Sequence, residues 1–264
     1  MLESAMDMGT LIPVFAFLFG LILGSFLNVC IHRMPTGSSI VHPPSSCPCC
    51  GASIRFYDNI PLLSYLLLRG RCRSCEASIP LRYPVVELAT GLLSLALVLR
   101  YGPGVPYALY LAFVCALIVV TFIDLQHQII PDVISLPGIA AGIAVSLTPW
   151  GTVSWVDALI GAAAGGGGLF AVAWGFERLT GKEGMGLGDV KLLAMIGAWM
   201  GWRTLPFIIL SSSLFGILIG GAALMVSRRG LQARIPFGPF LALGALLMLF
   251  FGRGIRHFYY GLFF

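Results

Sequence analysis

Eight stretches of the sequence are apolar and close to the length at which a helix crosses a membrane. They lie near residues 10–31, 85–101, 106–124, 132–148, 156–176, 190–201, 204–227 and 236–252. A helix needs about 20 apolar residues to cross about 30 Å of hydrocarbon. Only 10% of the 264 residues are charged, against about 25% in soluble domains. We therefore expect an all-α polytopic membrane protein with about eight transmembrane helices; because the stretch at 190–201 is short, six or seven crossings are the alternative.

The placement of the basic residues predicts how the chain is oriented. Twelve of the sixteen Lys and Arg residues lie in one set of alternate loops, and four lie in the other set. Basic loops stay on the cytoplasmic side during membrane insertion. The first set is therefore expected in the cytoplasm, with both termini on the outer side. The same placement explains the net charge of +5 without a nucleic-acid partner, and none is expected.

One segment, residues 32–84, is too polar to lie in lipid and carries five of the seven cysteines. We expect three parts in the chain: a first transmembrane helix at 1–31, a cytoplasmic domain at 32–84 and a transmembrane core at 85–264. A domain of about 50 residues usually needs a metal ion or disulfides to stay folded.

Two C-x-x-C motifs in this segment predict a metal site. Cys47 and Cys50 form the first, Cys72 and Cys75 form the second, and 21 residues separate them. Two such pairs can place four thiolates around a structural Zn²⁺, which leaves no open position for catalysis. Disulfides are the alternative, but they conflict with a cytoplasmic location. Cys49 could take the place of Cys50 as a ligand, although the spacing favours Cys50.

Four acidic residues are not explained by loops or chain ends. Asp124 ends an apolar stretch, Asp132 follows Pro131, Asp189 follows the glycines at 184, 186 and 188, and Glu87 begins another stretch. A carboxylate at membrane depth costs about 3 kcal/mol on insertion scales. Helix capping is a competing interpretation for Asp132 and Asp189, whereas Asp124 lies at a helix end that disfavours negative charge.

Asp124 and Asp189 are expected at similar depth on the cytoplasmic side. Two adjacent carboxylates can share one proton, because the charge of the first raises the pKa of the second. The ionised member can then take a proton from water while the protonated member polarises a carbonyl. The residues alone are compatible with an aspartyl protease site and also with local structure.

Seven segments in order resemble one known family. They are GSFLNVCIHRMP at 24–35, CPCC and CRSC in the cysteine loop, DNIPLLSYLLLRGRC at 58–72, YPVVELATG at 83–91, FIDLQHQIIPD at 122–132, GMGLGDVKLLAMIGAWMG at 184–201 and PFGPFLALG at 236–244. Together they resemble the type IV prepilin peptidases, the GxGD group of intramembrane aspartyl proteases. The resemblance runs through nearly the whole chain; only Cys30 departs from it, since aliphatic residues are commoner there.

This resemblance implies a function and assigns residues to it. It implies an aspartic endopeptidase of the bacterial inner membrane that cleaves leader peptides from prepilins and pseudopilins at the cytoplasmic face. The catalytic pair falls on Asp124 and Asp189, while Asp132 matches a position outside the pair. Members with the four-cysteine loop often also methylate the new N-terminal residue with S-adenosylmethionine. No residue of the sequence can be assigned to that methyl donor, and the oligomeric state cannot be read.

Two other classes of function are considered. A transporter or channel would place acids nearer the middle of spans and would show inverted repeats, and neither is seen in the sequence. A non-enzymatic assembly protein could use the zinc loop for docking. The arginines of that loop, among them Arg55 and Arg73, either determine topology or bind anionic lipid and substrate.

Overall fold

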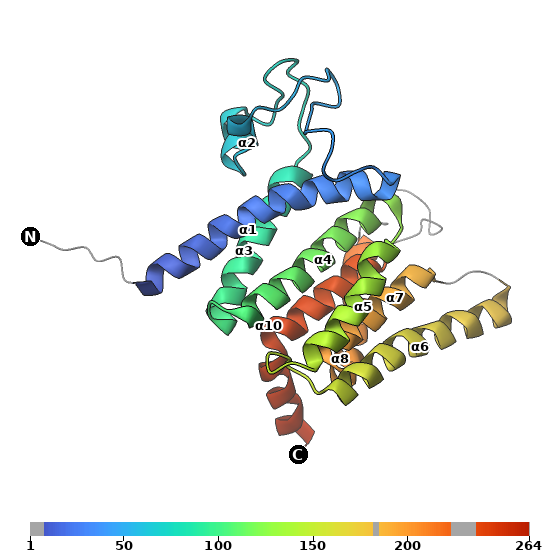
Figure 1. The fold of residues 1–264 in the computed structure, drawn as a ribbon. Helices are drawn as coiled ribbons and strands as arrows, with labels where there is room; N and C mark the ends of the chain where they lie inside the picture. The colour runs from blue at the N-terminus through green and yellow to red at the C-terminus, as the bar shows by residue number, and fades with distance from the viewer. Residues whose placement is uncertain (1–7, 182–184, 223–235, 264) are drawn as a thin grey trace, which may run out of the picture. The chain divides into compact units, whose positions relative to one another are not determined.

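A computed structural model describes residues 8–181, 185–222 and 236–263 of the chain. Gly184, Lys182 and the basic residues at 228, 229 and 234, which contribute to the sequence-based predictions, lie outside these ranges. Within them the chain is helical and contains no strand, apart from two isolated bridges in the cysteine segment. The prediction of an all-α protein is confirmed (Figure 1).

The described helices follow one another along the chain with short connections, except between α1 and α3. They are α1 (Met8–Arg33), η1 (Met34–Thr36), η2 (Phe56–Asn59), α2 (Leu63–Leu67), α3 (Arg82–Tyr101), α4 (Val105–His127), α5 (Asp132–Ser146), α6 (Trp155–Thr180), α7 (Leu187–Met200), η3 (Trp202–Thr204), α8 (Leu205–Phe215), the π-helical turn η4 (Gly216–Gly220) and α10 (Gly238–Phe263).

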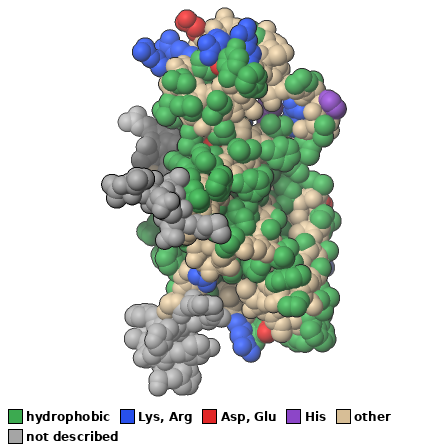
Figure 2. Space-filling model, turned by 60° about the vertical axis from the view of Figure 1, so that its left-hand side comes forward, with side chains coloured by type: hydrophobic (Ala, Val, Ile, Leu, Met, Phe, Trp, Pro, Cys, Tyr) green, Lys and Arg blue, Asp and Glu red, His purple; other side chains and the backbone are tan. Residues whose placement is uncertain are grey.

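Five of the described helices are long and apolar enough to cross a membrane. They cover Leu11–Thr36, Arg82–Tyr101, Val105–His127, Trp155–Thr180 and Trp202–Gly220, and two shorter apolar helices cover Asp132–Ser146 and Gly238–Gly252. Hydrophobic side chains spread over the face drawn in Figure 2, while Lys and Arg gather at its top, where Figure 1 shows the segment between α1 and α3. The prediction of a multi-pass membrane protein is confirmed; the number of eight crossings stays a prediction.

The chain divides into two compact units, Met1–Val119 and Val120–Phe264. In the first, α1 and α3 pack side by side and antiparallel (Figure 1). Glycines permit their close contact, because a Cβ at Gly20 would lie 2.6 Å from the Cβ of Ser94, and one at Gly24 would lie 2.6 Å from the Cα of Glu87. The polar segment that follows α1 therefore returns to the start of α3 next to the end of α1.

In the second unit α7 is the central helix. It packs against α5, α6 and α10, and every residue from Leu192 to Met200 is buried. A helix that is apolar on all sides is stable when it is surrounded by other helices. Gly165 of α6 allows the approach, since a Cβ there would lie 2.6 Å from the carbonyl oxygen of Leu193. The short stretch predicted at 190–201 thus forms the core of this unit, with Asp189 in its first turn.

Candidate functional site

Asp124 lies near the C-terminal end of α4 and is buried, with 5% of its surface exposed. The backbone N–H of Gly238, the first residue of α10, donates a hydrogen bond to its Oδ2 atom over 3.0 Å. The first N–H groups of a helix have no partner within the helix and favour a negative charge. The start of α10 therefore compensates for the unfavourable position of Asp124 at the end of its own helix.

Asp189 lies in the first turn of α7 and is half-buried. The helix is preceded by Gly186, which is extended and occupies the N-cap position, so Asp189 is the third helical residue and not the cap. A position in the first turn still favours a carboxylate. The capping interpretation of Asp189 is therefore wrong, and its side chain is available to meet another group.

Ile130 connects the surroundings of the two aspartates. A Cβ placed at Gly188 would lie 3.0 Å from the Cβ of Ile130, and one placed at Gly238 would lie 3.2 Å from its Cδ1. The residue before Asp189 and the residue bonded to Asp124 thus contact the same side chain. The two carboxyl groups are also close enough to interact electrostatically. The fold brings together two acids that are 65 residues apart in the sequence.

Asp132 has a different environment. It is the first residue of α5, where Pro131 is the N-cap, and its two carboxylate oxygens accept hydrogen bonds from Lys191 Nζ over 2.7 and 2.8 Å. Lys191 is in the first turns of α7, so this ion pair connects α5 to α7. Both side chains are partly exposed. The arrangement agrees with a local structural role for Asp132 and supplies the partner that the sequence did not reveal.

The aspartate pair has the chemical features that hydrolysis by water requires. One carboxylate already accepts a backbone hydrogen bond, which favours its ionised form. The second carboxyl group lies within electrostatic reach, so a single proton held between the two is favoured over two full charges. Such a pair can activate a water molecule and polarise a carbonyl without a nucleophilic side chain.

A second cluster lies in the segment between α1 and α3. One sulfur atom from each of Cys47, Cys50, Cys72 and Cys75 lies within 4.8 Å of every other. The sulfur atoms of Cys47 and Cys75 are 3.8 Å apart, and four thiolates at about 2.3 Å from a central Zn²⁺ are separated by about 3.8 Å. The donors and their spacing therefore fit a tetrahedral metal ion. Cys50, not Cys49, belongs to the cluster.

The two C-x-x-C turns have the same backbone structure. The N–H of Cys47 donates to the carbonyl of Ala52, and the N–H of Cys72 donates to that of Ala77, each over 2.9 Å. Gly51 and Glu76 follow the second cysteine of each turn, with φ of 71° and 56°. The sequences CPCCGAS and CRSCEAS therefore form a short internal repeat. This repeat was not predicted from the sequence, although the shared Ala-Ser ends could have revealed it.

The turns also prepare the thiols for a metal ion. The backbone N–H groups of Cys50 and then Cys49 lower the pKa of the Cys47 thiol to about 6. The N–H of Ala77 acts in the same direction on Cys75, but burial and hydrogen bonds to the other three thiols raise its pKa to about 12. Four thiols without a cation resist full ionisation, and a bound cation removes that resistance because thiolates are its ligands.

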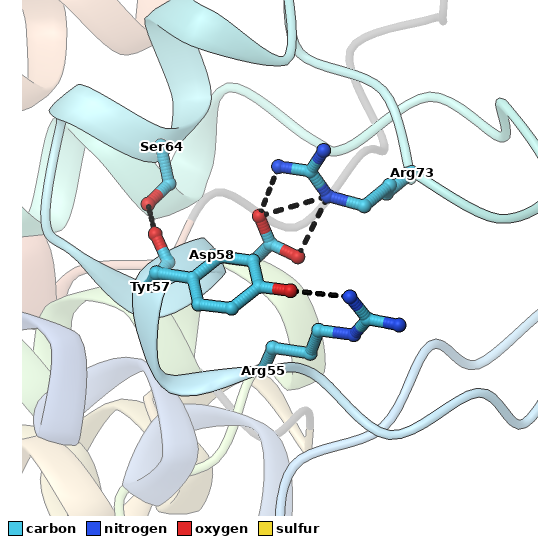
Figure 3. A network of polar contacts seen from close by, with 5 residues as sticks. All are labelled: Arg55, Tyr57, Asp58, Ser64 and Arg73. Carbon is cyan, nitrogen blue, oxygen red and sulfur yellow. Dashed lines mark hydrogen bonds and ion pairs between the residues drawn. The ribbon is translucent and has the colours of Figure 1, made fainter.

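A polar network fixes the loop between the two turns (Figure 3). The guanidinium of Arg73 donates to both carboxylate oxygens of Asp58, at 2.6 to 3.1 Å, and this lowers the pKa of Asp58. Arg55 donates to the hydroxyl of Tyr57, and Ser64 donates to the carbonyl of Tyr57 over 3.1 Å. Arg73 lies within the second C-x-x-C turn, so the network ties that turn to η2.

Two family models match successive parts of the chain. The Bacterial Peptidase A24 N-terminal domain matches residues 18–101, and the Type IV leader peptidase family matches residues 111–221. The first match contains the four-cysteine cluster, and the second contains Asp124, Asp189 and the ion pair of Asp132 with Lys191.

Similar proteins match over most of their length. A protein from Aeromonas hydrophila named prepilin leader peptidase/N-methyltransferase is 42% identical, over 98% of this chain and 97% of the relative. Proteins of the same name are 42% identical in Pseudomonas aeruginosa, over 92% and 91%, and 40% identical in Burkholderia pseudomallei strain 1026b, over 90% and 85%. No solved structure matches the chain.

Proposed function

Since the chain belongs to the type IV leader peptidase family, we propose that Asp124 and Asp189 are the catalytic carboxylates with which it removes leader peptides from prepilins. The protein is a membrane peptidase that cleaves prepilins and N-methylates the new N-terminus, as its relatives are named. The observation that carries the residue assignment is the meeting of two acids from α4 and α7 beside the start of α10.

In the proposed reaction the two carboxyl groups share one proton. The ionised carboxylate takes a proton from a water molecule, whose oxygen attacks the scissile carbonyl carbon, and the protonated carboxyl donates a hydrogen bond to the carbonyl oxygen. The proton taken from the water then passes to the leaving amine. The N–H of Gly238 holds the carboxylate of Asp124 in one orientation, and Ile130 keeps the backbone of Gly188 and Gly238 at a fixed separation.

The four cysteines are proposed as ligands of a structural Zn²⁺. Four thiolates complete a tetrahedral shell, and such a site stabilises the fold without taking part in hydrolysis. The segment from η1 to α3 contains only short helices and few buried side chains, so Cys47, Cys50, Cys72 and Cys75 supply its main cross-link. Disulfides are not needed to explain the cluster, in which all four thiols are free.

Orientation follows from the charge distribution. We place the cysteine segment and the two aspartates at the cytoplasmic face of a bacterial inner membrane, because the basic residues concentrate in the loops on that side. The substrates are prepilins or pseudopilins whose leader peptide reaches this face, and lipids surround the apolar helices. The methyl donor is S-adenosylmethionine, as the name N-methyltransferase indicates for the relatives.

The direct test is incubation of purified protein with a prepilin and labelled S-adenosylmethionine, followed by mass analysis of the product N-terminus. We expect loss of the leader together with gain of one methyl group. A product that keeps its leader would refute the peptidase assignment, and a cleaved product without a methyl group would limit the function to cleavage.

A further inference from the structure

A pocket of about 560 Å³ lies in the first unit, where the end of α1 and the start of α3 meet the cysteine segment. Sites for small organic molecules usually have about 300 to 1,000 Å³. Helical and loop residues line it together, including Ser25, Asn28, Tyr83, Glu87, Cys47 and Cys72. The aspartate pair belongs to the other unit and does not line this pocket.

Asn28 carries an unused hydrogen-bond acceptor at this pocket. Only 2% of the residue is exposed. Its Nδ2 group donates to the carbonyl of Gly24 over 3.3 Å and to that of Tyr83 over 3.1 Å, whereas its buried Oδ1 atom has no partner among the described residues. A buried polar atom without a partner is rare and lowers stability unless a bound molecule supplies a donor. The helix contact therefore fixes Asn28 with its amide oxygen available.

Glu87 adds a buried negative charge. It is 8% exposed, and its carboxylate accepts hydrogen bonds from the N–H of Leu62 over 2.8 Å and from Ser25. In the described part of the chain, the ion pairs join Arg73 to Asp58 and Lys191 to Asp132, so none reaches Glu87. Buried carboxylates are normally paired with a cation. The pocket wall thus offers acceptors and negative charge.

The backbone beside Glu87 is strained in a way that maintains the pocket. Leu62 has a φ of 60°, and the N–H of Leu63 donates to the carbonyl of Pro61 over 2.6 Å, which closes a γ-turn centred on Leu62. This turn is rare and strained for a residue with a side chain. The bond from Leu62 N–H to Glu87 holds the turn in place, so the loop wall is fixed to α3.

We propose that this pocket binds the methyl donor S-adenosylmethionine, with the Asn28 amide oxygen and the Glu87 carboxylate as its acceptors. The donor is a cation with a sulfonium, an ammonium group, ribose hydroxyls and an adenine amino group, so it matches a wall of acceptors. Arg33 and Arg73 also line the pocket, and a guanidinium can pair with the donor's carboxylate. The inference rests on the proposed N-methylation and gives it a location.

The proposal is tested by direct binding to the full-length protein in detergent. Isothermal titration with S-adenosylmethionine, and separately with S-adenosylhomocysteine, is compared for the wild type, Asn28→Leu and Glu87→Gln. Losing one hydrogen bond to a buried or charged group typically weakens binding by about tenfold or more, and we expect a rise in Kd of at least about tenfold for S-adenosylmethionine in each variant.

Thr90→Val is the matched control. Thr90 is fully buried on the same helix as Glu87, donates to the carbonyl of Val86 over 2.7 Å and does not line the pocket. We expect this variant to bind with the wild-type Kd and all three variants to unfold at temperatures close to that of the wild type. Wild-type affinity in folded Asn28→Leu and Glu87→Gln would overturn the proposal.

Two further outcomes separate this inference from the proposed function. If the variants bind the donor normally but need more prepilin for half-maximal cleavage, the pocket is a substrate site and the inference is wrong. If the wild-type protein cleaves prepilin but binds no donor, both the pocket assignment and the N-methylation are wrong while the peptidase assignment stands. If the wild type binds the donor and the variants do not, yet no prepilin is cleaved, the pocket stands and the peptidase assignment fails.

Discussion

The cysteine segment and the aspartate pair keep their reactive groups in place by different means. In the segment between α1 and α3, four cysteines from two equivalent turns supply the cross-link, and short helices contribute little packing. In the second unit, the buried helix α7 and the starts and ends of neighbouring helices position Asp124 and Asp189. One region depends on ligands close in sequence, whereas the other depends on tertiary packing.

This difference predicts how each region fails. A metal-bound loop should lose its order when a ligand is removed, because little else holds it. A carboxylate held by surrounding helices should keep its place when its charge is removed, because packing determines the position. Substitutions in the two regions separate these two behaviours.

The largest effect is expected from Asp124→Asn and Asp189→Asn. Each replacement keeps the side-chain size but removes the carboxyl group that must gain or lose a proton, and such groups typically contribute about 10²-fold to 10⁴-fold to rate. We expect no detectable leader cleavage from either variant in a standard time course, with normal membrane insertion and zinc content. Cleavage at a near-normal rate in either one would remove that residue from the pair.

A smaller loss of cleavage is expected from Gly238→Ala. The new Cβ would lie 2.6 Å from Oδ2 of Asp124, so the carboxylate or the start of α10 must shift. Displacing a catalytic group by about 1 Å can cost about a hundredfold in rate, and we expect a fall in kcat of about tenfold to a hundredfold. Gly254→Ala on the same helix is the control, because a Cβ there meets nothing within 4 Å; equal rates in the two variants would argue against the role of Gly238.

Removing a cysteine ligand should affect the first region selectively. Cys72→Ser is expected to lower the zinc content from about one ion per chain and to make the segment between α1 and α3 more sensitive to protease. Cys49→Ser should leave zinc content unchanged, since Cys49 lies outside the cluster. Elemental analysis and limited proteolysis provide the measurements. Protein that contains no metal and has its four thiols joined as disulfides would contradict the zinc assignment.

The smallest effect is expected from Asp132→Asn. Its ion pair with Lys191 is partly exposed, and such pairs contribute about 0 to 1 kcal/mol. Leader cleavage should fall by no more than about fivefold, which corresponds to that energy at room temperature. A loss as large as that of Asp124→Asn would show that Asp132 takes part in the chemistry.

Local spacing made the cysteine cluster predictable, whereas packing determined most of the aspartate site. Cys47, Cys50, Cys72 and Cys75 were identified from two short motifs, because ligands three residues apart in a turn meet one ion. The choice of Cys50 over Cys49 and the shared backbone of the two turns required the structure. The identity of the metal as zinc stays a prediction.

Asp124 and Asp189 could be paired only through the resemblance, because no local pattern joins residues 65 positions apart. The contribution of Gly238 could not be predicted, since it comes from a backbone N–H and not from a side chain. Ile130 was hidden for a related reason: an apolar residue before Pro131 has no distinctive signature. The prediction of an all-helical membrane protein succeeded because an apolar stretch about 20 residues long is typical of a helix that crosses a membrane.

The central claim is that one proton is shared by Asp124 and Asp189 during cleavage, and the pH dependence of kcat/KM for leader removal tests it most directly. One carboxyl group must be ionised and the other protonated, so the account predicts a bell-shaped profile between about pH 4 and about pH 9, with both limbs assigned to the pair and not to either residue alone. A rate that only rises across this range, or that does not change with pH, would contradict the account.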